Sequence, residues 1–346
     1  RDVYKRQRVG DLLVDGRYKL VERLKQGGFG TIYRAYDRHR HGLVAIKVLH
    51  GQYADDRTRI ERFFRGARKM AELTHPGIVR VLEPRFDDEG HHFFIMEYLP
   101  GGDLRDAVIK GSLASEQTLD LIETLAEVLA YAHAQAVVHR DVKPANIVLD
   151  ARLNPKLTDF DLVLAGDTTG GTRTGFLGTF NYAAPEALSH AKNVDARADV
   201  YGLGMTAVFA LLGKEPDFVQ MVRDPEAVLS ELPTPERLRA VLSQATAWRA
   251  VDRFASVLAF RDALREARRA ASQRSSRPSS GPDQVAPHTD VDPSSPPPSF
   301  RDEFTNSDDI GPEMIWLPGG TFTIGSPDGV GEDREHPAHR VQLSHY

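Results

Sequence analysis

The sequence predicts an α+β fold in which a small, strand-rich lobe precedes a larger, helical lobe. The first observation is one change in hydrophobic period: short runs before about residue 99 read as strands, and helical spacing dominates from Ser115 onward. The second is a shift in composition, because residues 271–300 contain 8 Ser and 7 Pro and therefore resist packing into a core. One folded domain followed by a linker explains both observations.

The first lobe is expected to consist mainly of strands. Alternating or short apolar runs predict strands at residues 18–24, 31–36, 43–49, 78–86 and 92–99. One helix-like interval, at residues 56–73, interrupts them.

The second lobe is expected to be helical. One helix face carries a regular apolar series, and Ser115 is the expected N-cap of this helix. The series consists of Leu119, Ile122, Leu125, Ala126 and Leu129. The apolar run at 200–212 is shorter than a membrane span and contains Tyr201 and two glycines, so it predicts a buried helix.

Composition excludes several classes of protein. The chain has 44 Lys and Arg against 49 Asp and Glu, a net charge of −5, which gives no bias toward nucleic acid or an anionic membrane. The absence of Cys excludes a disulfide scaffold and a zinc–thiolate site, and it suits a reducing, cytoplasmic compartment. Residues 1–11 are interpreted as a tail or a library scar, with no secretory signal and no membrane segment.

Five short motifs carry the chemistry. They are a Gly-rich turn at 27–30, Val-Ala-Ile-Lys at 44–47, His-Arg-Asp-Val-Lys-Pro-Ala-Asn at 139–146, Thr-Asp-Phe-Asp at 158–161 and Ala-Pro-Glu at 184–186. In this order they resemble the eukaryotic-type (bacterial Hanks-type) protein kinases over residues 12–268. Lys143 indicates the Ser/Thr branch. The resemblance implies a bilobal kinase-like fold and transfer of the ATP γ-phosphate to Ser/Thr hydroxyls of protein substrates in bacterial signalling.

Each motif residue suits phosphoryl transfer, which needs positioning and charge neutralisation more than covalent help. Gly27 and Gly30 let backbone amides approach phosphates, and Lys47 supplies a point charge to them. Asn146 and Asp159 offer the oxygen ligands that Mg²⁺ prefers.

The catalytic pair follows from the same loop. Asp141 can orient the acceptor hydroxyl and take its proton, and the resemblance gives Lys143 a contact to the γ-phosphate. Taken singly, Asp141, Asn146 and Asp159 could also be turn-capping residues.

The resemblance also implies an ATP pocket and its cofactors. Met96 takes the gatekeeper position, Glu97 and Leu99 lie in the hinge that pairs with the base, and Asp103 contacts the ribose. Further nucleotide contacts are expected from Gly28, Ile32 and Ala45. The implied cofactors are ATP and Mg²⁺, or Mn²⁺ in its place.

Other residues match supporting roles in the family. The resemblance implies that His139 and Asp199 brace the catalytic loop and that Arg253 pairs with Glu186. Thr172 and Thr174 are the expected autophosphorylation sites, since an Arg precedes Asp141 and could pair with a phosphate. The alternative is a Thr/Gly-rich loop that is not modified.

Three departures from the family pattern support a second hypothesis. Lys25 replaces the first Gly of the Gly-rich loop, Gly66 stands where a helix Glu should pair with Lys47, and Asp161 replaces the Gly of the metal-binding triplet. Glu61 and Glu72 could substitute for the missing Glu, but they lie on different helix faces. The alternative function is therefore a nucleotide-binding pseudokinase scaffold.

The C-terminal segment suggests a second domain. Residues 269–311 are predicted to be a Ser/Pro-rich linker, with a lesser alternative of a docking site for a Pro-binding domain. Residues 312–346, with Pro-Gly-Gly-Thr-Phe-Thr-Ile-Gly-Ser at 318–326, resemble the start of a formylglycine-generating (sulfatase-modifying factor) domain of lectin-like fold. The resemblance implies that the catalytic cysteines of active members would lie beyond Tyr346, and a domain of this fold that binds a ligand or a partner is the equal alternative. His336 and His339 are interpreted as solvated loop residues.

Overall fold

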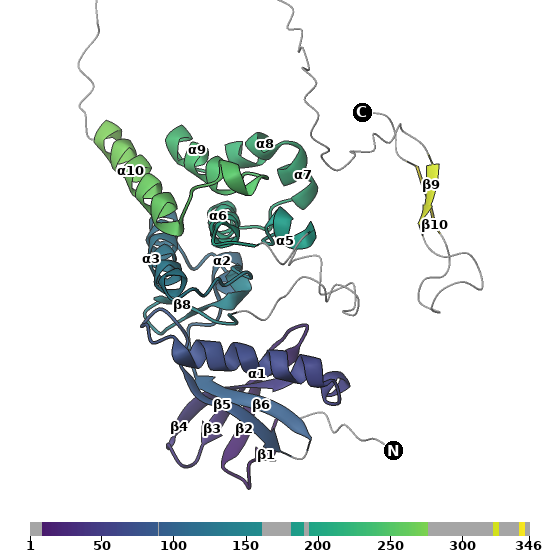
Figure 1. Cartoon of the computed structure of the whole chain (residues 1–346). Helices are drawn as coiled ribbons and strands as arrows, with labels where there is room; N and C mark the ends of the chain where they lie inside the picture. The colour runs from purple at the N-terminus through teal and green to yellow at the C-terminus, as the bar shows by residue number, and fades with distance from the viewer. Residues whose placement is uncertain are drawn as a thin grey trace, which may run out of the picture. The chain divides into compact units, whose positions relative to one another are not determined.

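The computed structural model describes residues 9–88, 90–160, 181–189, 194–275, 321–324 and 339–342. The chain divides into two compact units, residues 1–280 and residues 281–346. Within the first unit a β-sheet with one long helix forms the N-terminal lobe, and a group of helices forms the C-terminal lobe (Figure 1). The α+β prediction of a strand-rich lobe followed by a helical lobe is confirmed.

The N-terminal lobe is an antiparallel sheet of six strands in the order β1-β2-β3-β4-β6-β5. The strands are β1 (Leu12–Leu13), β2 (Tyr18–Gln26), β3 (Gly30–Asp37), β4 (Gly42–Leu49), β5 (Val81–Asp88) and β6 (His91–Glu97). The strand predicted from residue 78 begins three residues later, because Val79 N–H donates to Leu157 of the other lobe (2.9 Å) and so leaves the sheet.

One helix, α1 (Arg57–Glu72), packs against this sheet after the short turn η1 (Gly51–Tyr53) (Figure 1). Asp56 caps it by accepting from Thr58 N and Arg59 N. Phe63, Phe64, Ala67 and Met70 form its buried face, which is the spacing that the sequence predicted for residues 56–73.

The C-terminal lobe is built from helices and one small hairpin. Its elements are α2 (Leu104–Ile109), α3 (Ser115–Ala134), η2 (Pro144–Asn146), β7 (Ile147–Leu149), β8 (Pro155–Leu157), α5 (Pro185–Ser189), α6 (Arg197–Leu212), α7 (Phe218–Arg223), α8 (Pro225–Ser230), α9 (Glu236–Ala245), η4 (Ala250–Asp252) and α10 (Val257–Ser275).

Helices α3 and α6 form the centre of this lobe. The predicted apolar face of α3 is buried. The N-cap of α3 is Ala114, not Ser115 as predicted, because Gln117 Oε1 accepts from Ala114 N–H (3.0 Å) one residue earlier. Helix α6 is buried almost all round, so the predicted buried helix is confirmed. No helix in the described part of the chain is long and apolar enough to cross a membrane.

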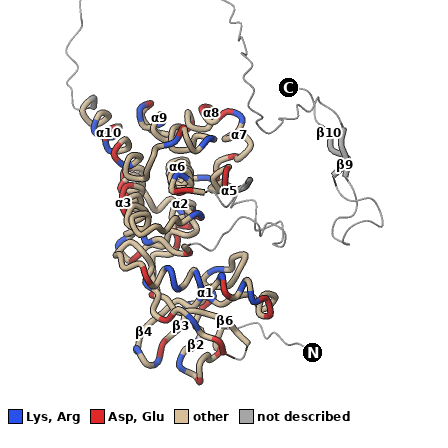
Figure 2. The backbone as a smooth tube through the Cα atoms, viewed as in Figure 1, with Lys and Arg blue, Asp and Glu red and all other residues tan. Residues whose placement is uncertain are grey.

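Helix α10 runs to Ser275, seven residues past the domain end expected at residue 268. It lies beside α3, and charges of both signs are interspersed along both lobes (Figure 2). In the second unit, β9 (Thr321–Ile324) pairs antiparallel with β10 (His339–Gln342).

Candidate active site

The catalytic loop is fixed by one buried carboxylate at the start of α6. Asp199, fully buried, accepts from the backbone N–H groups of His139 (2.8 Å) and Arg140 (2.7 Å). Its Oδ2 also lies 2.7 Å from His133 Nε2, a partner that the sequence did not reveal because α3 gives no local signal for it. Arg140 keeps a left-handed backbone (φ 65°) that such bonds must hold in place.

His139 connects this loop to the metal-binding triplet. Its side chain is fully buried, and its Nε2 lies 2.9 Å from Thr158 O. The centroid of its ring lies 4.4 Å from the ring centroid of Phe160. The Asp141 N–H donates to His139 Nδ1 (3.3 Å). These bonds give His139 the bracing position that the sequence predicted.

Asp141, Lys143 and Asn146 form one hydrogen-bonded cluster. Lys143 Nζ lies 2.9 Å from Asp141 Oδ1, and Asn146 Nδ2 donates to Asp141 Oδ2 (2.8 Å) and to Asp141 O (2.9 Å). The Asp141 carboxylate is 13% exposed, so it is partly desolvated, and two donors set its orientation. The structure therefore brings the predicted catalytic pair together.

Lys47 on β4 pairs directly with Asp159, with Nζ 2.6 Å from Oδ2 and side-chain exposures of 7% and 14%. Asp159 adopts a left-handed φ of 67°. Burial alone would raise the pKa of this carboxyl, but the charges of Lys47, Lys143 and Lys25 bring the pKa below its ordinary value. The site therefore keeps Asp159 ionised.

Lys47 thus has a carboxylate partner although α1 carries a buried glycine, Gly66, at the expected Glu position. The two glutamates that the sequence offered as alternative partners, Glu61 and Glu72, do not pair with Lys47. Glu61 pairs instead with Arg85 (3.1 Å) and is 60% exposed, and Glu72 is exposed.

A divalent metal fits the residues present. Asp159 Oδ1 is buried and accepts no hydrogen bond, which leaves an unpaired anionic oxygen inside the site. Asn146 commits its amide nitrogen to Asp141, so its amide oxygen is the side left for a ligand. In the described residues no cluster of three or more His, Asp or Glu side chains could hold a metal. A site with one carboxylate and one amide suits Mg²⁺, which takes its remaining ligands from phosphates and water.

The glycines of the Gly-rich turn have two different structural roles. Gly27 N–H donates to Gly30 O (2.9 Å) and closes the turn, and a Cβ on Gly28 would meet nothing within 4 Å. A Cβ on Gly30 would instead collide with Val48 O on β4. Gly30 is therefore required by strand packing, while Gly27 and Gly28 leave open backbone for a phosphate.

Four of the predicted nucleotide contacts share one apolar surface. Ala45 and Met96 are buried and face each other across β4 and β6. Ile32 and Leu99 pack against the same core cluster, half-buried. These side chains can exclude water from a flat base.

Glu97, the first residue of the predicted hinge, forms hydrogen bonds through both its backbone N–H and its carboxylate. Its N–H donates to Arg80 O (2.9 Å), and its carboxylate accepts from Lys156 Nζ (2.9 Å) and Arg80 N (2.8 Å). These bonds fix the position of Glu97 at the end of β6.

Asp103 and Lys25 meet across the cleft. Asp103 caps α2, and its Oδ2 lies 2.6 Å from Lys25 Nζ on β2, which also donates to Ala145 O (2.7 Å). The sequence identified each residue separately but did not predict their contact.

The Ala-Pro-Glu motif is anchored as the resemblance implied. Arg253, 4% exposed, donates from both terminal nitrogens to Glu186 (2.7 and 2.8 Å) and also to the carbonyls of Ala247 and Trp248. Asp161, Thr172 and Thr174 lie outside the described residues.

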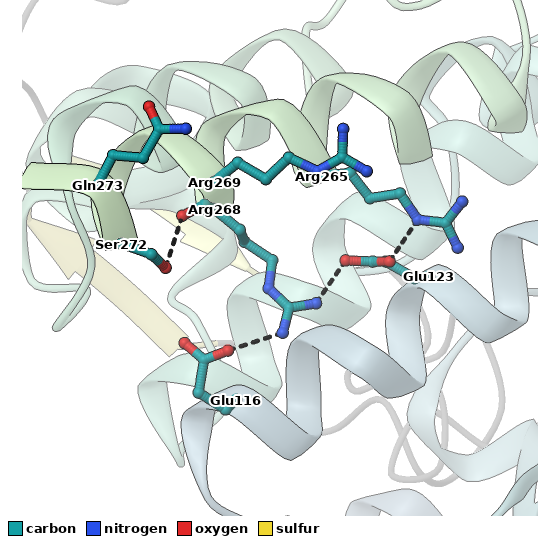
Figure 3. Close-up of a pocket in the computed structure, with 7 residues that line it drawn as sticks. All are labelled: Glu116, Glu123, Arg265, Arg268, Arg269, Ser272 and Gln273. Atoms are coloured by element: carbon teal, nitrogen blue, oxygen red, sulfur yellow. Dashed lines mark hydrogen bonds and ion pairs between the residues drawn. The ribbon is translucent and has the colours of Figure 1, made fainter. Parts of the chain in front are cut away.

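A second hollow lies between α3 and α10 and is lined by charged side chains (Figure 3). Arg265 pairs with Glu123 (2.6 Å), and Arg268 pairs with Glu116 (2.7 Å) and also with Glu123. It contains none of the predicted site residues.

Comparisons with known proteins agree with this geometry. A family model of the protein kinase domain matches residues 18–255. The serine/threonine-protein kinase PknA of Mycobacterium tuberculosis is 38% identical over 216 residues, which are 60% of this chain and 49% of that protein. PrkC of Bacillus subtilis is 34% identical over 205 residues, 59% of this chain and 31% of that protein.

A solved structure shows the same fold. The kinase domain of Mycobacterium tuberculosis PknI matches with a TM-score of 0.61 and 30% identity, over 75% of this chain and 99% of that one. The chain belongs to the protein kinase family. The curated relatives just named are serine/threonine-protein kinases, and the chain spans about half the length of PknA.

Proposed function

We propose that this protein is a Ser/Thr protein kinase that transfers the ATP γ-phosphate to hydroxyl groups of bacterial signalling proteins. The observation that carries the proposal is the cluster in which Lys143 and Asn146 orient the Asp141 carboxylate. A hydroxyl bound beside this carboxylate can donate its proton to Asp141 as the oxygen attacks phosphorus. Lys47 and Lys143 supply positive charge for the phosphates, and Asp159 and Asn146 would hold Mg²⁺ or Mn²⁺, which neutralises phosphate charge when bound.

The test is transfer of labelled phosphate from ATP to the chain itself and to Ser/Thr peptides. Asp141→Asn should lower transfer by about 10²–10⁴-fold, because the general base is lost, while nucleotide binding persists. Asp262→Asn, the same change on exposed α10, should leave transfer intact. Equal transfer by wild type and Asp141→Asn would contradict the proposal.

A pseudokinase scaffold is the second candidate, and the absence of a Glu at Gly66 favours it. In this reading Lys47 stays bound to Asp159 and keeps the metal ligand occupied. Nucleotide binding by the wild type without any transfer would establish it. Gly66→Glu should then produce measurable transfer by giving Lys47 a second partner, and Gly66→Gln, of similar size but uncharged, should not. Unchanged transfer by Gly66→Glu would show that the missing Glu is not the cause.

We propose that Thr172 and Thr174 are phosphorylated by the kinase itself. Two neighbouring hydroxyls follow the metal-binding triplet in a Thr/Gly-rich stretch of this sequence. Mass spectrometry after incubation with ATP should find phosphate there in the wild type and not in Asp141→Asn. Phosphate only at other residues would contradict this assignment.

We propose that residues 269–311 tether the kinase domain to a formylglycine-generating-enzyme-like domain that opens at residue 312 and binds a ligand or partner. Support comes from the pairing of β9 with β10, since both strands fall in the stretches that carry the resemblance. The test is the sequence beyond Tyr346 in the intact protein. Cysteines there would favour oxidase chemistry, their absence a binding domain, and an unrelated continuation would contradict the proposal.

We also propose that the kinase domain acts in the cytoplasm, because ATP is abundant there and a chain without Cys suits a reducing compartment. Cell fractionation with an antibody to the kinase domain tests this location, and recovery outside the cytoplasm would contradict it.

A further inference from the structure

Lys25 of the N-terminal lobe bridges to the C-terminal lobe through two hydrogen bonds. Its ammonium lies 2.6 Å from Asp103 Oδ2 and 2.7 Å from Ala145 O, residues that follow it by 78 and 120 positions. Lys25 belongs to the sheet, Asp103 to the first turn of α2, and Ala145 to the catalytic loop. One side chain therefore holds both sides of the cleft.

The Asp103 end of this bridge is held in place by other hydrogen bonds. Asp103 Oδ1 accepts from Asp106 N–H (2.9 Å) as the cap of α2, and Asp103 bridges to Val148 of β7. Each oxygen of the carboxylate therefore already accepts one bond, so another hydrogen-bond donor at Oδ2 must share this oxygen with the ammonium of Lys25.

The Lys25 end of this bridge is able to move. The Lys25 side chain is 35% exposed, whereas that of Asp103 is 16% exposed. A lysine on a flexible four-carbon stem can leave its partner and be solvated at small cost. The bridge can therefore be broken at its lysine end without disturbing Asp103.

Charge in the cleft is balanced by three Lys–Asp pairs. Lys47 pairs with Asp159 (2.6 Å) and Lys143 with Asp141 (2.8 Å), while Lys25 pairs with Asp103. The first two pairs hold groups that the transfer reaction uses. The lysine of the third pair stands at the first position of the Gly-rich segment and also contacts Ala145 of the catalytic loop.

We propose that Lys25 straps the nucleotide site shut: its bonds to Asp103 and Ala145 hold the two lobes together, and a nucleotide must open them to enter. The proposal rests on the proposed function, because it takes the cleft to be the ATP site. The apparent affinity for any ligand of the cleft is then lowered by the fraction of molecules that are strapped.

The experiment measures binding of adenosine, which has no phosphate for a lysine to attract, by calorimetry. Lys25→Met should bind adenosine about three- to tenfold more tightly than the wild type, because an ion pair of this exposure competes with the ligand by roughly that factor. Lys19→Met removes an exposed charge from the same strand and should leave the affinity unchanged.

The salt dependence of adenosine affinity is a second measurement. A lysine with only a structural role would not change it. Ions screen the strap, so higher ionic strength should tighten adenosine binding by the wild type and have no such effect on Lys25→Met. Unchanged or weaker adenosine binding by Lys25→Met, or no adenosine binding by either protein while both bind ATP, would overturn the strap alone. Failure of every protein to bind ATP would instead overturn the proposed function.

Discussion

The cleft and the contact between α3 and α10 both consist of ion pairs, yet they use different cations. In the cleft three lysines each hold one aspartate. Between the helices Arg265 and Arg268 share Glu116, Asp120, Glu123 and Glu127. Lysine is a point charge that can exchange its partner for a phosphate, whereas the planar guanidinium of arginine holds several acceptors in fixed directions. The molecule thus places exchangeable pairs where a ligand binds and fixed networks where helices pack.

The largest expected effect comes from breaking the pair at the centre of the cleft. Lys47→Met should reduce phosphate transfer by about 10²–10³-fold, because a preorganised charge facing the phosphates is lost. Labelled transfer from ATP measures it, with Lys19→Met as the control. Transfer within about twofold of the wild type would mean that another cation, such as Lys143, performs this role.

Replacing a buried arginine should mainly lower stability, whereas replacing Lys47 should mainly lower phosphate transfer. Arg253→Met removes the guanidinium that bonds Glu186 and three backbone carbonyls, so the free energy of unfolding should fall by about 3–5 kcal/mol. Urea unfolding measures this loss, and Arg249→Met, on a 74% exposed side chain, is the matched control. A loss below about 1 kcal/mol would contradict the fixed role assigned to buried arginine.

The Lys47–Asp159 pair should also appear in the pH dependence of stability. Because the pKa of Asp159 is lowered in the folded protein, its contribution is present above the ordinary aspartate value of 3.8 and is lost as pH falls through the folded pKa. Asp159→Asn should therefore flatten the acid side of the curve of unfolding free energy against pH. Identical curves for the two proteins would contradict the pKa direction.

The smallest effect is expected between α3 and α10. Arg268→Ala should cost about 1 kcal/mol or less, since two of its three partners are more than two-thirds exposed, and added salt should reduce the difference further. Thermal unfolding at low and high salt measures it, with Arg269→Ala as the control on the same helix. A loss above about 2 kcal/mol would show that the network is a main source of stability.

Much of the fold could be predicted because it depends on local pattern. The apolar faces at 56–73 and on α3 recur at helical spacing, and most predicted strands agree with the sheet to within a few residues. The errors lie at boundaries. Ile78 and Val79 pair with Leu157 of the other lobe instead of the sheet, and Gln117 moves the cap of α3 to Ala114.

The sequence by itself determined the order of the motifs and the kinase family, and it predicts the roles of Asp141, Asn146 and Asp159, because residue type and spacing along the chain carry that information. Only the tertiary structure decided which charges meet. That Lys47 pairs with Asp159, that Lys25 reaches Asp103 and that His133 supports Asp199 depend on distances between elements far apart in the chain. Electrostatic energy falls with distance in space, so no pattern along the sequence could assign these partners.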